Sequence, residues 1–414
     1  MKPLPHFLRA LGSRNYRIYI TGQCISYLGN WMTATASLWL AYHLSGSAFI
    51  VGLVGFANWI PLLLLAPFAG VLVDRTDGLK LVRITQTLAT LQTGTLAVLT
   101  LSGHITVPIL IGLCLLQGLI YSFDDAARQM LVVGLAGDRA LLDNVIALNS
   151  ISINVTRLVG PALAGLLIAG VGPGVCYAID ASCYLAVLVA LAAVRIAPRP
   201  TRPQRPHPLT ELREGLAYAW EHAPIRRVLL LGPVVSLVGF THTLLAPVFA
   251  RDVFGGDART LGFLMSTSGL GSLVGGAFLS TRRGAFAFPR AIAWGPFIGC
   301  AGFFGIALSP SLPLGLLSYA AAGLGATLFL VSTNTWLQQV VADDKRGRTM
   351  SLFGMGQGFY PIGSLLLGAF TAAIGPQVAI AGCGLVLLAS GSWFVRAFFH
   401  SSPSLPAKVL ADAP

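Results

Sequence analysis

Charged residues are scarce in this sequence. Only 10% of the 414 residues are Asp, Glu, Lys or Arg, whereas 55% are hydrophobic. Ordinary soluble domains carry about 25% charged residues. The apolar residues also form blocks long enough to cross a bilayer, which takes about 20 residues each. The composition therefore excludes an ordinary soluble protein and predicts one whose main solvent is lipid.

Motifs for nucleotide hydrolysis, covalent catalysis and metal binding are also absent. No Gly-rich loop ends in Lys followed by Ser or Thr, so the sequence lacks the phosphate cradle of an ATPase. No nucleophile elbow accompanies a matching His and acid. The six cysteines lie in or beside apolar blocks, without the spacing that zinc requires. We therefore predict no enzyme activity, no metal and no cofactor, and energy must come from an ion gradient or the substrate's own gradient.

Acidic residues are outnumbered by basic ones, 15 against 27, which gives a net charge of +12. The basic residues occur in short clusters between apolar blocks and form no continuous face, which argues against a nucleic-acid partner. With both termini placed inside, 24 of the 27 fall at the cytoplasmic face, two fall outside and Arg157 falls within a span. This bias is typical of cytoplasmic loops and predicts that both termini are cytoplasmic.

Twelve apolar blocks predict twelve transmembrane helices. The first six lie near residues 17–43, 48–73, 79–102, 106–126, 144–169 and 174–195. The second six lie near residues 227–250, 260–281, 289–309, 312–336, 348–373 and 377–399. The first block is too long for a cleavable signal peptide and should remain as a helix.

The predicted fold is an all-α membrane protein of two six-helix bundles, residues 1–195 and 227–400. Residues 196–226 form a cytoplasmic linker, which begins rich in Pro and Arg. It continues as an amphipathic helix on the membrane surface, with Thr210 as its cap. Residues 401–414 are predicted to be a disordered cytoplasmic tail.

Three stretches resemble a known family. Residues 70–83 read GVLVDRTDGLKLVR, residues 123–167 contain ARQ, ALNS and NVTRLVGPALAG, and residues 337–368 contain QQVVADDKRGR and PIGS. In this order, they resemble the enterobactin-exporter-like and macrolide-efflux-like branch of the major facilitator superfamily. The parallel placement of Gly160-Pro161 and Tyr360-Pro361 in the two halves agrees with the internal repeats of that fold.

The resemblance implies roles for two groups of residues. Gly70, Asp74 and Arg75 match the superfamily's loop after the second span, which latches one conformation with a partner such as Arg128; solvated loop charges are the alternative. Gly160, Pro161 and Gly165 resemble the antiporter motif of major facilitator exporters and favour export over import. Without the resemblance, Pro and Gly predict only a kinked, closely packed helix.

Arg157 and Asp180 are the sharpest features inside the spans. A cation in the bilayer is costly, so Arg157 should face the bundle interior and have a partner. Asp180 is a buried acid in the next span, and we predict that the two form an ion pair. Protonation of Asp180 or binding of an anionic substrate would then compete within that pair, unless the pair is purely structural.

Three neutral polar residues within spans are predicted to line a substrate cavity: Asn30, Asn58 and Gln357. Relatives of the branch often have Asp where this chain has Asn30, which weakens a proton-coupling role there.

The predicted function is a secondary active transporter in the bacterial inner (plasma) membrane, monomeric and working by alternating access. It would export an amphipathic small molecule, such as a drug, macrolide or siderophore, in exchange for protons. A carrier of a lipid or other metabolite and a non-transporting sensor or assembly protein of the same fold are the alternatives. The sequence leaves the substrate, the coupling ion and the oligomeric state open.

Overall fold

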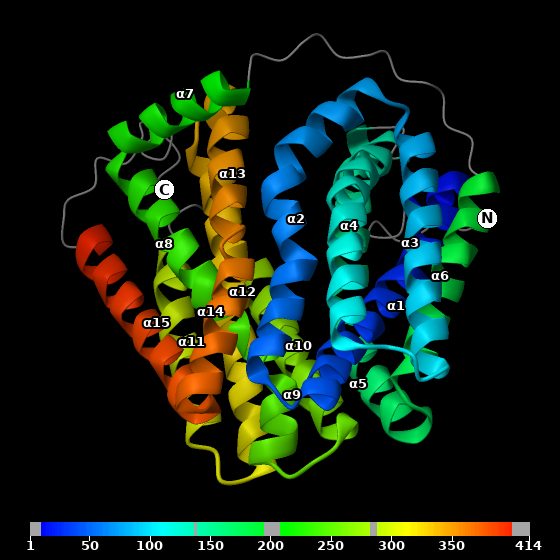
Figure 1. The fold of residues 1–414 in the computed structure, drawn as a ribbon. Helices are drawn as coiled ribbons and strands as arrows, with labels where there is room; N and C mark the ends of the chain where they lie inside the picture. The colour runs from blue at the N-terminus through cyan, green and yellow to red at the C-terminus, as the bar shows by residue number, and fades with distance from the viewer. Residues whose placement is uncertain (1–9, 136–138, 194–207, 282–287, 400–414) are drawn as a thin grey trace. The chain divides into compact units, whose positions relative to one another are not determined.

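The computed structural model describes residues 10–135, 139–193, 208–281 and 288–399, and every regular element in these ranges is helical (Figure 1). The first half contains α1 (Arg14–Ser45), α2 (Ala48–Arg75), α3 (Gly78–Leu101), α4 (Val107–Leu135), α5 (Arg139–Val171) and α6 (Pro173–Ala193). The second half contains α7 (Pro208–Glu221), α8 (Ala223–Gly239), η2 (Thr241–Thr243), α9 (Ala246–Val248), η3 (Phe249–Val253), α10 (Ala258–Ser280), α11 (Phe288–Ala307), α12 (Leu312–Val340), α13 (Asp343–Gln357), α14 (Tyr360–Ile374) and α15 (Pro376–Phe399).

Short polar residues begin and end the helices where the chain turns. The Ser13 hydroxyl accepts a hydrogen bond from the Tyr16 amide at the start of α1, and the Asp77 carboxylate accepts from Leu79 and Lys80 at the start of α3. Gly46 ends α1 with a φ of 61°, a left-handed conformation that costs glycine little. These local interactions determine where the chain leaves one helix and enters the next.

The prediction of an all-helical, multi-spanning protein is confirmed. Ten segments of the described residues are long and apolar enough to cross a membrane. The predicted spans at 17–43 and 79–102 are not among them, although both form helices, α1 and α3. These two helices carry more polar side chains, and several of these are buried within the protein: Gln23, Ser26 and Thr35 in α1, and Thr85, Gln86 and Gln92 in α3.

Two predicted spans are interrupted rather than continuous. The span near 227–250 consists of α8, a short 3₁₀ turn, α9 and the π turn η3. The span near 348–373 is divided between α13 and α14, with Gly358 and Phe359 between them. Glycines at 354, 356 and 358 and Pro361 weaken regular helical hydrogen bonding there.

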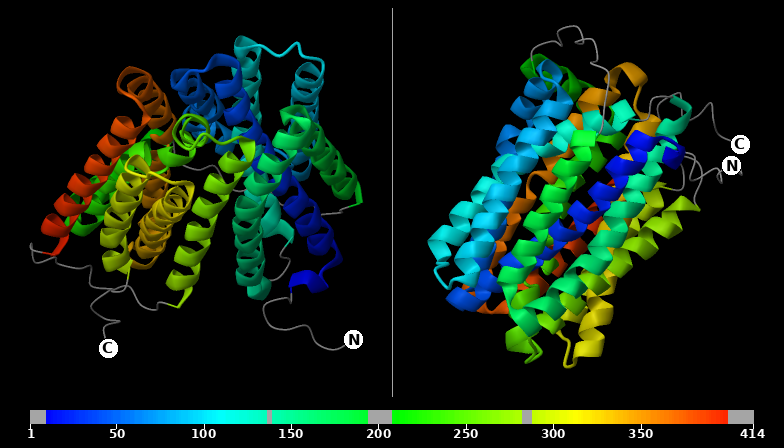
Figure 2. Two further views of the ribbon diagram at one scale, coloured as in Figure 1. Left: turned by 90° about the horizontal axis from the view of Figure 1, so that it is seen from below. Right: turned by 90° about the vertical axis from the view of Figure 1, so that its right-hand side faces the viewer.

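The chain divides into two compact units. Unit 1 comprises residues 1–46, 57–203 and 256–266, and unit 2 comprises residues 47–56, 204–255 and 267–414. In unit 1, α6 packs beside α1, α3 and α5, and α4 packs beside α3 (Figure 2). In unit 2, α11 packs between α12 and α15, and α8 packs against α13, α14 and α15.

The helix predicted in the linker is α7, and it belongs to unit 2. It packs on α13, where the Arg348 guanidinium forms an ion pair with the Glu214 carboxylate and the Arg348 backbone lies close to Gly215. α7 also exposes the apolar side chains of Leu216 and Trp220. The prediction that Thr210 caps this helix is wrong, because α7 begins at Pro208, two residues earlier. The predicted tail at 401–414 lies outside the described residues.

Gly118 provides a test of helix packing within unit 1. A Cβ atom at Gly118 would clash with the backbone of Asn58 and lie 3.0 Å from Pro61 Cδ, whereas a Cβ atom at Gly112 in the same helix would meet nothing within 4 Å. We expect Gly118→Ala to destabilise the protein by about 1–3 kcal/mol because backbone must move. Thermal unfolding in detergent, followed by tryptophan fluorescence, measures this. Gly112→Ala is the control, and equal melting temperatures for the two variants would contradict the packing.

Candidate functional site

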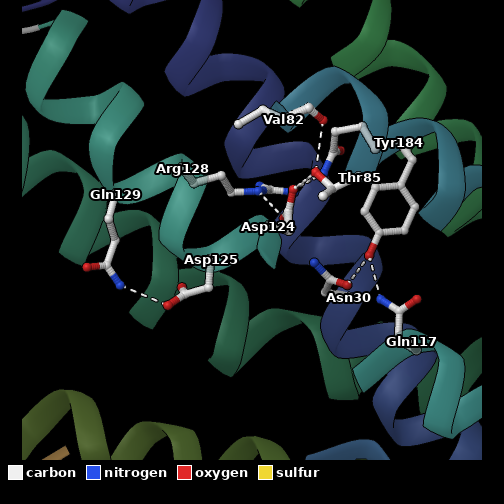
Figure 3. Close-up of polar contacts among 10 residues, drawn as sticks. Asn30, Val82, Thr85, Gln117, Asp124, Asp125, Arg128, Gln129 and Tyr184 are labelled. Atoms are coloured by element: carbon white, nitrogen blue, oxygen red, sulfur yellow. Dashed lines mark hydrogen bonds and ion pairs between the residues drawn. The ribbon is translucent and has the colours of Figure 1, made fainter. Parts of the chain in front are cut away.

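A buried ion pair lies on α4 of unit 1. Asp124 and Arg128 are one turn apart on α4, and both side chains are buried, with 5% and 6% of the residue exposed. Arg128 Nε donates to Asp124 Oδ2. The other oxygen of Asp124 accepts from Thr85 Oγ1 at 2.6 Å and from Gln86 Nε2 at 2.9 Å, both on α3 (Figure 3). The carboxylate therefore joins α3 to α4 and compensates a charge that burial alone would make costly.

A second polar group joins α1, α4 and α6. The Tyr184 hydroxyl of α6 donates to Asn30 Oδ1 of α1 at 2.5 Å and accepts from Gln117 Nε2 of α4 at 3.2 Å (Figure 3). Asn30, predicted to line a cavity, is thus engaged in a bond between helices. An amide with its oxygen so occupied can still present its NH₂ group to a ligand.

Asp180 is fully buried in α6, and neither of its carboxylate oxygens has a hydrogen-bond partner among the described residues. It packs against Gly29 of α1, where any Cβ atom would clash with its Oδ1. Thr33 of α1 lies beside the carboxylate, but its hydroxyl does not reach hydrogen-bonding geometry. An acid buried without a partner is rare, because such groups are normally paired or hydrogen-bonded.

The structure does not pair Arg157 with Asp180, which corrects the prediction of an ion pair between them. The Arg157 guanidinium lies over the Trp31 ring of α1, 5.6 Å from its centroid, in a cation–π contact. The cation in electrostatic reach of Asp180 is instead Arg128 of α4. Close packing of Gly160 against Trp31 brings this ring of α1 to α5, where Arg157 contacts it.

The three residues of the antiporter-like motif lie on the packed side of α5. Gly160 is in contact with α1, where a Cβ atom would lie 2.5 Å from Cβ of Trp31. Pro161 is inside the helix, which continues past it to Val171. Gly165 lies against Ala258 and Gly262, which belong to the same unit. Close approach of backbones, which these residues were predicted to allow, is present at both glycines.

The predicted latch is only partly described. Gly70, Asp74 and Arg75 lie in α2, but their side-chain surroundings fall outside the described residues. Arg128 is described, and its partner in the structure is Asp124.

The remaining predicted cavity residues are half-buried. Asn58 presents its backbone carbonyl to Gly118 of α4. Gln357 ends α13, and its carbonyl accepts from Ser236 Oγ at 2.8 Å. Its side-chain Nε2 has no partner among the described residues.

The sequence interpretation missed Thr85, Gln86, Gln117 and Tyr184 as parts of the site. Each is a polar residue inside an apolar block, and that signal was present but did not say which residues meet. As for a metal, no group of three His, Cys, Asp or Glu side chains in the described ranges is placed to hold one.

The fold resembles those of solved transporter structures. A point mutant of the nucleoside transporter NupG superposes with a TM-score of 0.75 at 12% identity, covering 92% of this chain and all of that one. A bacterial homologue of the human lysosomal transporter Spinster superposes with a TM-score of 0.74 at 15% identity, covering 97% and 99% of the two chains. At these identities, the likeness concerns the fold alone.

The sequence identifies the family within that class. The model described as "Transmembrane secretion effector" matches residues 8–406, so the chain belongs to this family of the major facilitator superfamily. The protein is therefore a multi-pass membrane transporter and not an enzyme, as predicted.

Relatives in the family carry the names of exporters and transporters. The Staphyloferrin A transporter of Staphylococcus aureus is 26% identical over 85% of this chain and 88% of its own length. The multidrug efflux pump Tap of Mycolicibacterium fortuitum is 26% identical over 88% and 90%. The enterobactin exporter EntS of Shigella boydii is 26% identical over 86% and 83%. The predicted resemblance to this branch is confirmed.

The buried pair of Asp124 and Arg128 makes a stability prediction. Asp124→Asn leaves the Arg128 guanidinium buried without its counter-charge, and we expect a loss of about 3–5 kcal/mol in the free energy of unfolding. The double variant Asp124→Asn, Arg128→Gln should lose less than the sum of the two single variants. Denaturant titration in detergent measures all three.

The control for this cycle is the exposed pair Asp257 and Arg259, whose side chains are 58% exposed. Asp257→Asn should change stability by less than about 1 kcal/mol. Additive losses at Asp124 and Arg128 would contradict their coupling.

Proposed function

We propose that this protein is a proton-coupled exporter of an amphipathic small molecule and that Asp180 carries the coupled proton. The observation that carries the proposal is the burial of the Asp180 carboxylate in α6 with no ion-pair partner among the described residues and only the Thr33 hydroxyl of α1 beside it. An ionisable residue inside a membrane span is functional by default, because its burial costs free energy that packing alone does not return.

Alternating access gives Asp180 two environments. When the helices close around it, a bound proton removes the cost of burying an unpaired charge. When they open, water reaches the carboxylate and the proton leaves. Coupling requires that substrate binding favour one of these states over the other, and the polar groups of α1 and α6 beside Asp180 provide a route for that effect.

The proposed topology has twelve spans with both termini in the cytoplasm. The structure identifies ten apolar spans, and α1 and α3 supply the other two. With 32 and 24 residues, these helices extend about 48 and 36 Å at 1.5 Å per residue, enough for a hydrocarbon core of about 30 Å. The distribution of Lys and Arg supports cytoplasmic termini and insertion in the bacterial inner membrane.

The proposed substrate class is a drug, macrolide or siderophore. The names of the relatives support this class, since they include a siderophore transporter, an enterobactin exporter and a multidrug efflux pump. We assign cavity lining to Asn30, Asn58 and Gln357, the conformational latch to Gly70, Asp74, Arg75 and Arg128, and close helix packing during exchange to Gly160, Pro161 and Gly165. The transporter acts as a monomer in the bilayer.

Asp180→Asn tests the coupling. In proteoliposomes preloaded with a fluorescent amphipathic dye or an iron-free siderophore, we expect the variant to lose at least about tenfold of the efflux that a pH gradient drives. Exchange of labelled for unlabelled probe without a gradient should persist, because the neutral amide can mimic only the protonated acid.

The matched control is Asp257→Asn, which removes an exposed acid at the start of α10. It should transport like the wild-type protein. Gradient-driven efflux that is unchanged in Asp180→Asn would remove Asp180 from the coupling mechanism. Failure of every probe to exchange in the wild-type protein would remove the proposed substrate class.

A further inference from the structure

One face of α1 carries an unusual series of buried polar atoms. Tyr19, Gln23, Ser26 and Thr33 each have a buried side-chain oxygen or nitrogen with no hydrogen-bond partner among the described residues. At 100° per residue, these positions fall within about 80° of the helix circumference. They extend about 21 Å along the axis. A single helix face therefore holds a row of groups whose hydrogen bonds the protein itself does not complete.

The neighbouring helices place further incomplete groups against this face. Arg128 of α4 lies close enough to Tyr19 and Tyr27 to interact electrostatically with both. Gln23 is one turn from each tyrosine, and its side chain interacts with Tyr27 beside Arg128. Arg128 Nη1 is buried without a partner, as are both carboxylate oxygens of Asp180 beside Thr33. The row thus runs from Asp180 at one end to Arg128 and Tyr19 at the other.

The donors and acceptors in this row indicate which molecule can supply the missing hydrogen bonds. Gln23 Nε2 and Arg128 Nη1 can only donate, the Asp180 oxygens can accept, and the three hydroxyls can do either. An anion would satisfy the donors but would be repelled by a charged Asp180, and a cation would be repelled by Arg128. Water donates and accepts equally and is the usual partner of buried polar groups that the protein leaves unsatisfied.

We propose that this face of α1, defined by Tyr19, Gln23, Ser26 and Thr33, is a hydrated path that carries protons between Asp180 and the end of the bundle where α1 begins. The proposal rests on the proposed function, in which Asp180 is the proton carrier. At about 2.8 Å between hydrogen-bonded oxygens, the 21 Å length needs about seven steps, shared between waters and hydroxyls.

Proton movement along the path conserves atoms and charge. The O–H bond of the protonated Asp180 carboxyl breaks and its proton passes to an adjacent water, which passes one of its own protons to the next group. The same exchange repeats toward Tyr19, and one proton leaves for bulk water. Gln23 and Arg128 are positioning residues, since their N–H groups orient the waters and do not themselves transfer the proton.

The surroundings of Asp180 leave this route open on α1. The titratable groups of its own helix that interact with it are thiols and a phenol, and α1 contributes only the Gly29 backbone and the neutral Thr33. Charged groups described on the other helices include the Asp124–Arg128 pair and Asp125 on α4, and Arg157 of α5, which lies over Trp31 of α1. Arg83 on α3 donates to the Leu191 carbonyl at 2.6 Å.

Infrared spectroscopy after a pH jump tests the path without a substrate. The carbonyl band of protonated Asp180 is assigned as the band that disappears in Asp180→Asn. In Gln23→Leu, which replaces the amide beside Tyr27 by an apolar side chain of similar size, we expect the band to respond at least about tenfold more slowly than in the wild-type protein.

The matched control is Gln92→Leu. Gln92 is a buried glutamine of the same unit whose amide is satisfied: its Nε2 donates to the Leu113 carbonyl at 2.9 Å and its Oε1 accepts from Thr93. This variant should keep the wild-type rate. An unchanged rate in Gln23→Leu would overturn the path while leaving Asp180 as the proton carrier. A wild-type protein with no such band would overturn both.

A second measurement uses only the wild-type protein. X-ray radiolytic footprinting oxidises side chains next to bound water, including buried ones. Tyr19 is 3% exposed, and the control Tyr177 is fully buried with its hydroxyl bonded to Ser37. We expect Tyr19 to be modified at least about five times faster than Tyr177. Equal rates would show that the row is dry and would overturn the proposal.

Discussion

Buried polar side chains must find their partners inside the protein, because the hydrocarbon core of a bilayer offers none. In unit 1, this constraint is met at the Asp124 carboxylate, which accepts from Thr85 and Gln86 on α3 and from Arg128 on its own helix. The Tyr184 hydroxyl of α6 also finds its partners inside the protein, in Asn30 of α1 and Gln117 of α4. These bonds set the rotation of four helices about their axes and thereby determine what surrounds Asp180.

Asp180 is the exception that gives the unit its proposed chemistry. The buried acidic residues that the structure describes are Asp124 and Asp180, and both lie in unit 1. The first is fully compensated and holds helices together. The second lies against glycine and an unbonded hydroxyl, so its charge state is free to follow the access of water. The proposed function therefore gives two acids of the same type opposite roles, structural and titratable, because their neighbours differ.

Apolar blocks and Lys/Arg clusters predicted much of the fold. The helix boundaries follow polar turns and capping residues such as Asp77, which are local signals. The interruptions at Phe240 and Gly358 were not predicted, because a hydropathy pattern records burial and not the continuity of backbone hydrogen bonds. The linker helix was predicted, but its attachment to α13 through Glu214 and Arg348 depends on a contact between residues 134 positions apart.

The sequence suggested an ion pair between Arg157 and Asp180, because they lie in adjacent spans and an intramembrane cation should have an acidic partner. Their actual partners depend on helix rotation. Gly160 brings α5 against Trp31, where the Arg157 guanidinium finds a ring, and Gly29 lets the Asp180 carboxylate approach α1. Neither glycine shows, from the sequence alone, which side chain of another helix will pack against it.

The sequence by itself determined the solvent of this protein, its helical class and its family, because apolar block length, charge distribution and local motifs are properties of the chain alone. Only the tertiary structure decided that Asp124 and Arg128 compensate each other, that Arg157 faces an aromatic ring and that the polar row of α1 meets Asp180. These contacts depend on the rotation and closeness of packed helices, and those follow from the fit of all the side chains together.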